Sequence, residues 1–154
     1  MAFAVWITGL PGSGKTTISI KAKELLQKRK INVKLLQLDE IRRAITPDPK
    51  YTEEERDIVY ASLAYMAKLL TEAGVNVIID ATANKQSYRD LARRLIPDFL
   101  EIYIKCPLEL CIEREKTRVA SFAPREIYKK AGKPKATVPG VNIAYEEPKK
   151  PEVI

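Results

Sequence analysis

A run of small residues followed by a lysine and a hydroxyl stands near the N-terminus. Residues 9–16 read Gly-Leu-Pro-Gly-Ser-Gly-Lys-Thr and match G-x-x-x-x-G-K-[ST] at each fixed position. In such a loop, backbone N–H groups surround an anion at the positive end of a helix. Lys15 is expected to reach the β- and γ-phosphates of a nucleoside triphosphate, and Thr16 to ligate Mg²⁺. The predicted triphosphate-binding residues are Gly9, Leu10, Pro11, Gly12, Ser13, Gly14, Lys15, Thr16 and Thr17.

Two carboxylates and an arginine follow apolar runs farther along the chain. Asp39 ends the run 33–38, Arg42 follows it by one helical turn, and Asp80 ends the run 75–79. A carboxylate can orient or deprotonate an acceptor hydroxyl, and a guanidinium can hold an anionic substrate. The chain has no histidine, so a general base must be a carboxylate, a lysine or a water. This pattern predicts phosphoryl transfer with Asp39, Lys15 and Arg42 as catalytic residues, and Asp80 as a Mg²⁺ ligand through water.

Simpler interpretations of the same residues stay open. Asp39 and Arg42 could form an exposed salt bridge at a helix start, and Asp80 could cap the end of a strand. Position within the fold decides between these interpretations and the catalytic one.

The elements that must position these residues alternate along the chain. Apolar runs predict strands at 3–8, 33–38, 75–79 and 99–105. Helices are predicted at 18–29, about 52–73 with Thr52 as N-cap, 85–95, and after Pro107. In the first helix, we expect Ile18, Ala22, Leu25 and Leu26 to share one apolar face. The pattern predicts an α/β fold, a three-layer sandwich of P-loop NTPase type with a parallel sheet covered by helices on both faces. Its ligands bind where the strands end, beside Asp39 and Asp80.

Length and composition limit the function further. The 154 residues predict a single domain over 1–154, and no apolar run is long enough for a membrane span or resembles a signal peptide. Cys106 and Cys111 lack metal-ligand spacing and are expected to be reduced core thiols, which favours the cytoplasm. The net charge of +7 suits nucleotides and nucleic acid alike.

Several segments together resemble the adenylylsulfate kinase family. They are residues 6–17, 38–42, 51–56 (Tyr-Thr-Glu-Glu-Glu-Arg, for the family's aromatic-Ser-x-Glu-Asp-Arg), 67–70, 101–111, 127–131, 140–141 and 145–148. The phosphate loop is common to P-loop proteins, whereas Tyr128-Lys129-Lys130 and Tyr145-Glu146-Glu147-Pro148 narrow the resemblance to this family. The resemblance implies an enzyme that uses ATP and Mg²⁺ to phosphorylate the 3′-hydroxyl of adenosine 5′-phosphosulfate (APS) in sulfate activation.

The resemblance also implies individual roles. Asp39 takes the acidic position near the acceptor hydroxyl, and Arg42 and Arg56 take the arginines that hold the phosphosulfate. Tyr51 takes the aromatic that stacks on the substrate adenine, and Arg114 the arginine against the ATP adenine. Lys129 and Lys130 fall in a mobile lid, expected at about 115–135, for which a solvated basic loop is the alternative. The implied partner is the small-molecule substrate, with a homodimer possible and no membrane or nucleic-acid partner expected.

The acceptor half departs from the family pattern. Gln37 stands where the family has the first of two acidic residues, and Val59 stands where it has a substrate-binding asparagine. Residues 80–89 stand where the family has Ser-Phe-Ile-Ser-Pro-Tyr-Arg. Val138 lies near the position of a lost adenine-stacking phenylalanine, residues 119–126 look like an insertion, and 151–154 stand where the family normally adds a strand and a helix.

These departures keep two further functions open. Asp39 to Arg42 and Asp80-Ala81-Thr82 also resemble polynucleotide-kinase-like enzymes, which would phosphorylate a 5′-hydroxyl or another small alcohol. No basic groove with interleaved aromatic residues is visible, so nucleic acid ranks second. The third possibility is a nucleotide-binding regulator without catalysis.

Overall fold

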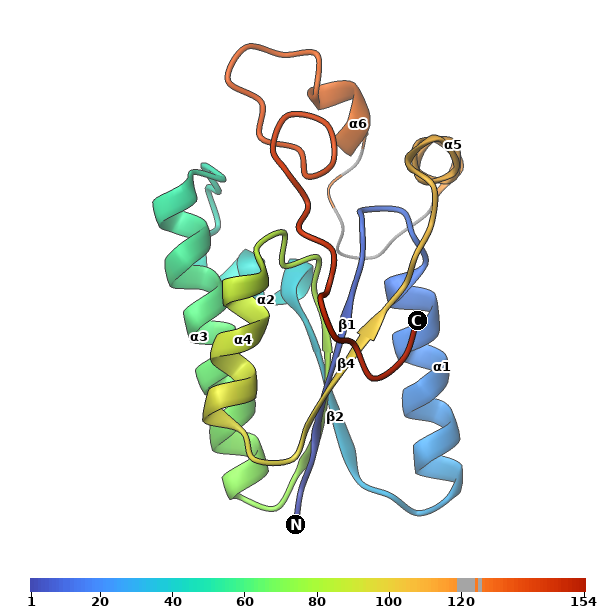
Figure 1. Ribbon diagram of the computed structural model, residues 1–154, viewed down its shortest axis with the longest axis vertical. Coiled ribbons are helices and arrows are strands. Elements are labelled where there is room, and N and C mark those ends of the chain that lie inside the picture. The colour runs from blue at the N-terminus through green and yellow to red at the C-terminus, as the bar shows by residue number, and fades with distance from the viewer. Residues whose placement is uncertain (119–123, 125) are drawn as a thin grey trace.

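Four parallel strands form the centre of the molecule. The computed structural model describes residues 1–118, 124 and 126–154. Strands β1 (Ala4–Thr8), β2 (Val33–Gln37), β3 (Asn76–Asp80) and β4 (Phe99–Tyr103) pair in the order β2-β3-β1-β4. Because all four run in one direction, their carboxyl ends meet at one edge of the sheet, where Figure 1 shows the loops gathered. This is the edge at which the sequence predicted a site.

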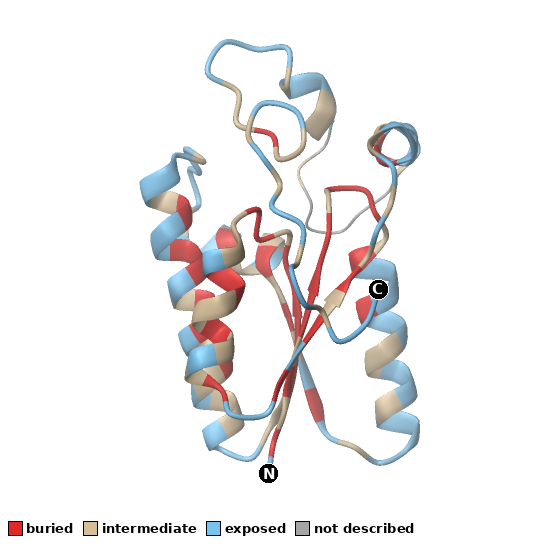
Figure 2. Cartoon of the chain, in the orientation of Figure 1, coloured by how far each residue is buried: buried red, intermediate tan, exposed pale blue. Residues whose placement is uncertain are grey.

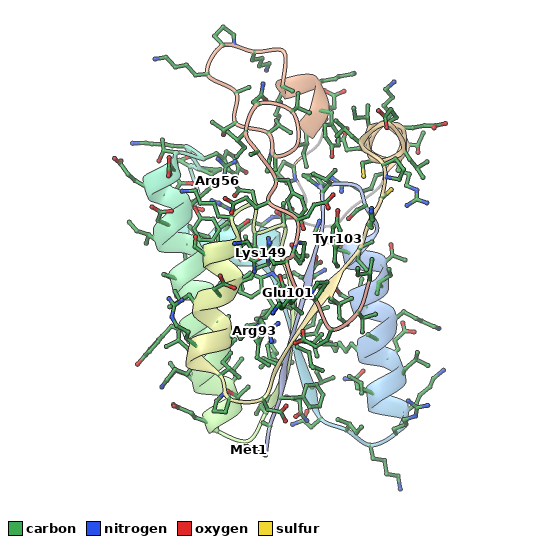
Figure 3. The ribbon with its side chains drawn as sticks, in the orientation of Figure 1. Met1, Arg56, Arg93, Glu101, Tyr103 and Lys149 are labelled. Carbon is green, nitrogen blue, oxygen red and sulfur yellow. The ribbon has the colours of Figure 1, made fainter. Side chains whose placement is uncertain are left out.

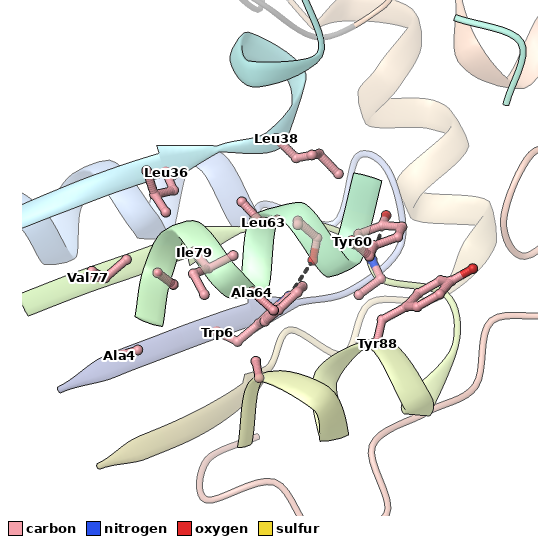
Figure 4. Close-up of a cluster of buried hydrophobic side chains, with 14 of the residues drawn as sticks. Ala4, Trp6, Leu36, Leu38, Tyr60, Leu63, Ala64, Val77, Ile79 and Tyr88 are labelled. Carbon is pink, nitrogen blue, oxygen red and sulfur yellow. Dashed lines mark hydrogen bonds between the residues drawn. The ribbon is translucent and has the colours of Figure 1, made fainter. Parts of the chain in front are cut away.

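Helices cover both faces of this sheet. Helices α3 (Glu53–Glu72) and α4 (Gln86–Leu95) lie on one face and α1 (Lys15–Lys28) on the other (Figure 1). The larger core lies under α3 and α4, where Trp6, Leu63 and Ile79 are fully buried (Figure 4). The predicted three-layer α/β sandwich is therefore confirmed. Thr52 caps α3 as expected, because its hydroxyl accepts a hydrogen bond from the Glu55 N–H at 3.2 Å.

The apolar face expected on α1 is only partly buried. Ala22 and Leu26 pack against the smaller core, but Ile18 and Leu25 are 42% and 47% exposed. The face of α1 that packs on the sheet contains Ser19, Ala22 and Leu26. Ile18 and Leu25 lie beside this face and stay partly exposed. Figure 2 accordingly shows α1 as the more exposed layer.

Three shorter helices surround the carboxyl edge of the sheet. Helix α2 (Leu38–Ile45) begins directly where β2 ends, so Asp39 lies in its first turn. Helix α5 (Leu108–Thr117) follows Pro107, and α6 (Ile127–Lys130) lies beyond it. The insertion predicted at 119–126 lies mostly outside the described residues.

Buried and surface ion pairs fasten the last residues to the sheet. Arg89 and Glu101 are 0% and 2% exposed and pair at 2.6 Å, and Arg93 approaches Glu101 at 3.6 Å (Figure 3). Glu152 binds Arg93 through both carboxylate oxygens and also accepts the Glu101 N–H. Val153 continues this contact by pairing in parallel with Ile102 of β4. Among the described residues, no helix combines the length and the apolar character that crossing a bilayer requires.

Candidate functional site

The glycine-rich loop bends around an open space between β1 and α1. Gly12 has a φ of 79°, and a Cβ on it would lie 2.6 Å from the Cys111 carbonyl oxygen, so only glycine fits there. Gly14 has a φ of 108°, and no atom of the described residues lies within 4 Å of a Cβ built on it. The loop is thus pressed against α5 on one side and open on the other, at the N-terminus of α1. An anion can reach the helix end from that open side.

Lys15 and Thr16 stand at the start of α1, beside this opening. The Lys15 ammonium donates to the Leu10 carbonyl oxygen at 3.1 Å, and burial lowers its pKa although Asp80 and Asp39 oppose the shift. The Thr16 hydroxyl donates to the Asp80 carboxylate at 2.6 Å. A hydroxyl and a carboxylate next to a phosphate loop are hard oxygen ligands of the kind that Mg²⁺ takes. The described residues contain no cluster of three metal-ligating side chains, so phosphates and water would have to complete such a site.

One cavity joins the phosphate loop to the predicted acceptor residues. Its volume is about 350 Å³, and its walls include Lys15, Thr16, Asp39, Arg42, Tyr51, Arg56 and Asp80. Eight of its described lining residues are lysine or arginine and two are aspartate. A cavity with this excess of positive charge is suited to ligands that carry several negative charges.

Asp39 faces this cavity from the first turn of α2. Burial is the largest effect and raises the pKa of its carboxyl above the ordinary 3.8. The positive charge of Lys15 lowers this pKa, and the negative charge of Asp80 raises it. A carboxylate with a raised pKa is a better proton acceptor than an exposed aspartate, because base strength follows the pKa. The structure therefore brings a usable base and the lysine of the phosphate loop to one cavity.

Arg42 and Arg56 lie near the ring of Tyr51, which is also a lining residue of the cavity. The Arg42 guanidinium carbon is 4.8 Å from the ring centroid, and that of Arg56 is 5.9 Å away. Both arginines are buried, with 7% and 8% of their surfaces exposed. Figure 3 labels Arg56 near the upper end of α3, below the loops that carry α6. Two guanidinium groups and an aromatic ring thus lie close together in the wall of the cavity.

Of the predicted phosphate-loop residues, Pro11, Lys15 and Thr16 line this cavity. Outside the loop, two residues from the sequence-based set, Lys129 and Arg114, do not line it. Lys129 forms a pair with Glu126 at 2.8 Å, and 71% of its side chain is exposed. Arg114 on α5 donates to the Ser13 carbonyl oxygen at 3.4 Å, behind the phosphate loop. It also approaches the Cys106 sulfur at 3.8 Å, and Cys106 lines a second, more open cavity together with Leu10.

The sequence analysis missed other cations that do line the cavity. They are Lys50, Arg118, Lys133 and Lys135, whereas Lys130, which was expected in the lid, also lines the cavity. Their signal was the density of lysine around the Tyr128-Lys129-Lys130 segment, but sequence could not tell which lysine of a short helix faces inward. Lys135 and Tyr51 both have φ near +60°, at 60° and 54°. Residues held in that unfavourable region often lie at functional sites.

Comparison with known proteins identifies the family. The model described as "Adenylylsulphate kinase" matches residues 1–154. The chain belongs to the adenylylsulfate kinase family. A probable adenylyl-sulfate kinase of Pyrococcus abyssi is 35% identical over 152 residues, which is 98% of this chain and 83% of that protein. One from Archaeoglobus fulgidus is also 35% identical, over 100% of this chain and 95% of the relative.

A solved structure of the family agrees with the fold. The adenylylsulfate kinase CysC of Mycobacterium tuberculosis, in complex with AMPPNP and APS, has a TM-score of 0.85 and 28% identity. The match covers 99% of this chain and 86% of the other. A sugar kinase from Janibacter has a TM-score of 0.69 at 24% identity, which shows a shared fold alone. The resemblance to adenylylsulfate kinases that the sequence motifs indicated is therefore confirmed.

Some of the departures from the family pattern lie in the wall of this cavity, and one lies in the core. Val138 is 7% exposed and lines the cavity, as do Ala81 and Thr82 of the segment that replaces the family's Ser-Phe-Ile-Ser-Pro-Tyr-Arg. Val59 is 1% exposed and belongs to the large core. Of these departures, Ala81, Thr82 and Val138 therefore lie where a ligand in the cavity can contact them, whereas Val59 does not line the cavity.

Proposed function

We propose that this protein transfers the γ-phosphoryl group of ATP to the 3′-hydroxyl of APS and so produces 3′-phosphoadenosine 5′-phosphosulfate. The observation that carries the proposal is the single cavity that joins Lys15 and Thr16 to Asp39, Arg42 and Arg56. Phosphoryl transfer asks a protein chiefly to position donor and acceptor and to neutralise charge. A cavity with a phosphate loop on one wall and a carboxylate and two arginines on the other meets both needs. The relatives' names and the APS complex of the M. tuberculosis enzyme support APS as the acceptor.

Each cavity residue then has a defined task. Backbone N–H groups of the loop, from residues other than Pro11, hold the phosphates together with the Lys15 ammonium, and Lys15 offsets charge that develops on the transferred group. Asp39 accepts the hydrogen bond of the 3′-hydroxyl and takes its proton as the new P–O bond forms. Arg42 and Arg56 bind the phosphosulfate, because guanidinium groups match the geometry of such oxyanions. Tyr51 offers the face of its ring to the adenine.

Mg²⁺ fits the pair formed by Thr16 and Asp80. Thr16 would ligate the ion directly and Asp80 would hold one of its water molecules. When bound, Mg²⁺ supplies positive charge to the phosphate oxygens. Arg114 would lie against the ATP adenine and Lys129 in the lid, and both roles stay predictions. The cytoplasmic location, the possible homodimer and the absence of a nucleic-acid partner also stay predictions.

The experiment that tests this function compares acceptors. The purified protein is given ATP and Mg²⁺ with APS, an oligonucleotide with a 5′-hydroxyl, or small alcohols such as gluconate, and ADP release is followed. We expect turnover with APS at least about a hundredfold above the other acceptors in kcat/KM, because the arginines and Tyr51 recognise groups that the others lack. Preferential phosphorylation of the oligonucleotide or a small alcohol would contradict the proposal. Nucleotide binding without turnover of any acceptor would point to a regulator.

A further inference from the structure

Glu55 occupies an unusual position at the start of α3, next to the acceptor side of the cavity. The residues before the helix, Lys50 and Tyr51, form a sharp corner that we call the 50–51 corner. Both corner residues line the cavity, and Tyr51 has a left-handed φ of 54°. A non-glycine residue in this region costs free energy, so something must hold the corner in place.

The Glu55 carboxylate makes three contacts with this corner and its neighbour. One oxygen accepts the Lys50 N–H at 2.8 Å. The other accepts the Tyr51 N–H at 3.2 Å and the Arg42 guanidinium at 2.9 Å. The Glu55 side chain is 17% exposed and that of Arg42 is 8% exposed, so the pair is largely withdrawn from water. A single side chain therefore ties α2 and α3 together through groups that face the cavity.

Helix capping alone does not account for this arrangement. In the usual capping box, the third helical residue returns a hydrogen bond to the N–H of the N-cap residue. Here the Glu55 N–H binds the Thr52 hydroxyl as a capping box requires, but the carboxylate reaches past Thr52 to the two residues before it. The carboxylate is thus directed at the corner and at Arg42.

The opposite side of the corner is held from other elements. The Tyr51 carbonyl oxygen accepts the Arg56 guanidinium at 2.8 Å and the Thr137 hydroxyl at 3.1 Å. Arg56 also donates to the Thr137 carbonyl oxygen at 2.6 Å. The backbone of Tyr51 is therefore held at both its N–H and its carbonyl oxygen, and Glu55 provides the acceptor for the N–H.

Charge supports the same conclusion. Burial alone would raise the pKa of Glu55, but the Lys50 and Tyr51 N–H groups and Arg42 lower it below the ordinary 4.5. The ionised carboxylate is therefore the favoured form, and in this form it pairs with Arg42 at 2.9 Å. Charge-assisted hydrogen bonds of this kind are stronger and more directional than neutral ones.

We propose that Glu55 is a positioning residue of the acceptor site, which holds the Arg42 guanidinium and the 50–51 corner in the arrangement that receives the anionic group of the acceptor. Glu55 acts through these groups and does not itself touch the substrate. The inference rests on the proposed function, because it assigns Arg42 and Tyr51 to the acceptor. It predicts that Glu55 affects acceptor binding and leaves the ATP side, which lies across the cavity, unaffected.

The test uses Glu55→Gln with Glu54→Gln as the matched control. Both changes remove one acid from the first turn of α3 and the same favourable interaction with the helix dipole, but Glu54 is exposed and no contact with the corner is recorded for it. For Glu55→Gln we expect the KM for APS to rise about tenfold, because a charged partner of Arg42 is lost. The kcat and the KM for ATP should stay within about twofold, and Glu54→Gln should leave all three unchanged.

A second measurement separates positioning from general damage to the fold. Glu55→Gln is combined with Arg42→Ala, and the dissociation constant for APS is measured by calorimetry. If Glu55 acts largely through Arg42, the tenfold effect should shrink to about threefold or less in the Arg42→Ala background. An equal effect in both backgrounds would overturn the inference, as would equal rises in the KM for ATP and for APS.

The two levels of the argument fail in different ways. If the unaltered protein turns over APS and Glu55→Gln leaves the KM for APS unchanged, the inference is wrong and the proposed function stands. If the unaltered protein does not use APS at all, the proposed function is wrong and the inference falls with it.

Discussion

At the scale of single residues, the proposed chemistry depends on Asp39 and Lys15. Burial raises the pKa of the Asp39 carboxyl and lowers that of the Lys15 ammonium, and each group opposes the shift of the other. Burial makes the Asp39 carboxylate a stronger base, and the nearby Lys15 ammonium favours its ionised form. This balance is what a general base beside a phosphate site requires.

Replacing Asp39 with asparagine tests this role. The amide keeps the size of the side chain but cannot take a proton, so we expect kcat to fall by at least about a hundredfold. The affinity for ATP, measured by titration calorimetry, should not change, because the phosphate loop is intact. A variant with more than half of the normal kcat would remove Asp39 from the mechanism.

The same substitution has an expected effect on stability. Because the folded pKa of Asp39 lies above its ordinary 3.8, folding favours the protonated form, and stability falls as pH rises through that interval. At neutral pH, Asp39→Asn removes the cost of burying the charge, so its unfolding temperature should exceed that of the unaltered protein. The difference should disappear below about pH 3, where the carboxyl is protonated in both states. A lower unfolding temperature at neutral pH would contradict the assigned pKa.

Sequence alone predicted the residues fixed to regular elements. Asp39 and Asp80 follow directly from strand ends, and the phosphate loop from its spacing, because a parallel sheet brings such ends to one edge. Lys129 and Lys130 were both expected in the lid, but of the two Lys130 lines the cavity, since the turn of a four-residue helix decides which lysine faces inward. The role of Glu55 depends on a left-handed Tyr51, and no residue pattern predicted that conformation.

At the scale of elements, α6 is fastened to the phosphate loop. The Tyr128 hydroxyl donates to the Pro11 carbonyl oxygen, and the Ile127 N–H donates to the buried carboxylate of Glu115 at 2.9 Å. These two contacts hold α6 between α5 and the loop. Lys130, which lines the cavity, comes from this helix. A shift of α6 would therefore move both the Pro11 contact of the phosphate loop and the cavity residue Lys130.

Tyr128→Phe tests this coupling. It removes one hydrogen bond and leaves the ring, so we expect the KM for ATP to rise about fivefold. The matched control is Tyr65→Phe, which alters an exposed tyrosine on α3 that does not line the cavity. Steady-state rates at varied ATP check the prediction, and an unchanged KM for ATP in Tyr128→Phe would show that this contact does not matter for the nucleotide.

At the scale of the whole molecule, the segment around residues 145–146 packs against the ends of two strands. Arg89 donates to the Ala83 carbonyl oxygen in the loop after Asp80 and to the Glu146 carbonyl oxygen at 2.6 Å. Tyr145 shares a 2.8 Å hydrogen bond with Thr8, whose hydroxyl also binds the Thr82 carbonyl oxygen. The segment near the C-terminus thereby contacts both the end of β1 and the loop beyond β3.

Glu152→Gln tests how firmly this segment is held. The hydrogen bond with Arg93 lowers the pKa of Glu152 to about 2 against an opposing effect of burial. The pair therefore stabilises the fold above about pH 4.5, and its contribution is lost as pH falls from 4.5 towards 2. We expect Glu152→Gln to lower the free energy of unfolding by no more than about 1 kcal/mol at pH 7, because the pair is partly exposed.

Denaturant unfolding at several pH values checks this expectation. The difference between Glu152→Gln and the unaltered protein should narrow steadily below pH 4.5. Glu72→Gln, which removes an exposed pair with Lys68 on α3, is the control and should cost less at pH 7. A difference that grows at low pH would contradict the assigned ion pair.

The sequence predicted the architecture well for a physical reason. Near-continuous apolar strands and helices with clear caps leave few alternatives to a parallel sheet with two covered faces. The burial of α1 was predicted less well, because Ile18 and Leu25 are apolar yet lie beside the face that packs on the sheet. Long-range contacts such as that between Arg89 and Glu101 were not predicted, because they depend on how α4 packs on β4.

One measurement tests the central claim, that a single cavity brings ATP to the 3′-hydroxyl of APS. The protein is incubated with Mg²⁺, ATP whose γ-phosphoryl oxygens are labelled with ¹⁸O, and either APS or its 3′-deoxy analogue. The position of the labelled phosphate in the product is then determined by ³¹P NMR. The account predicts label on the 3′-oxygen of APS and no transfer to the deoxy analogue, which should instead compete with APS. Label at another position, or transfer to the deoxy analogue, would contradict it.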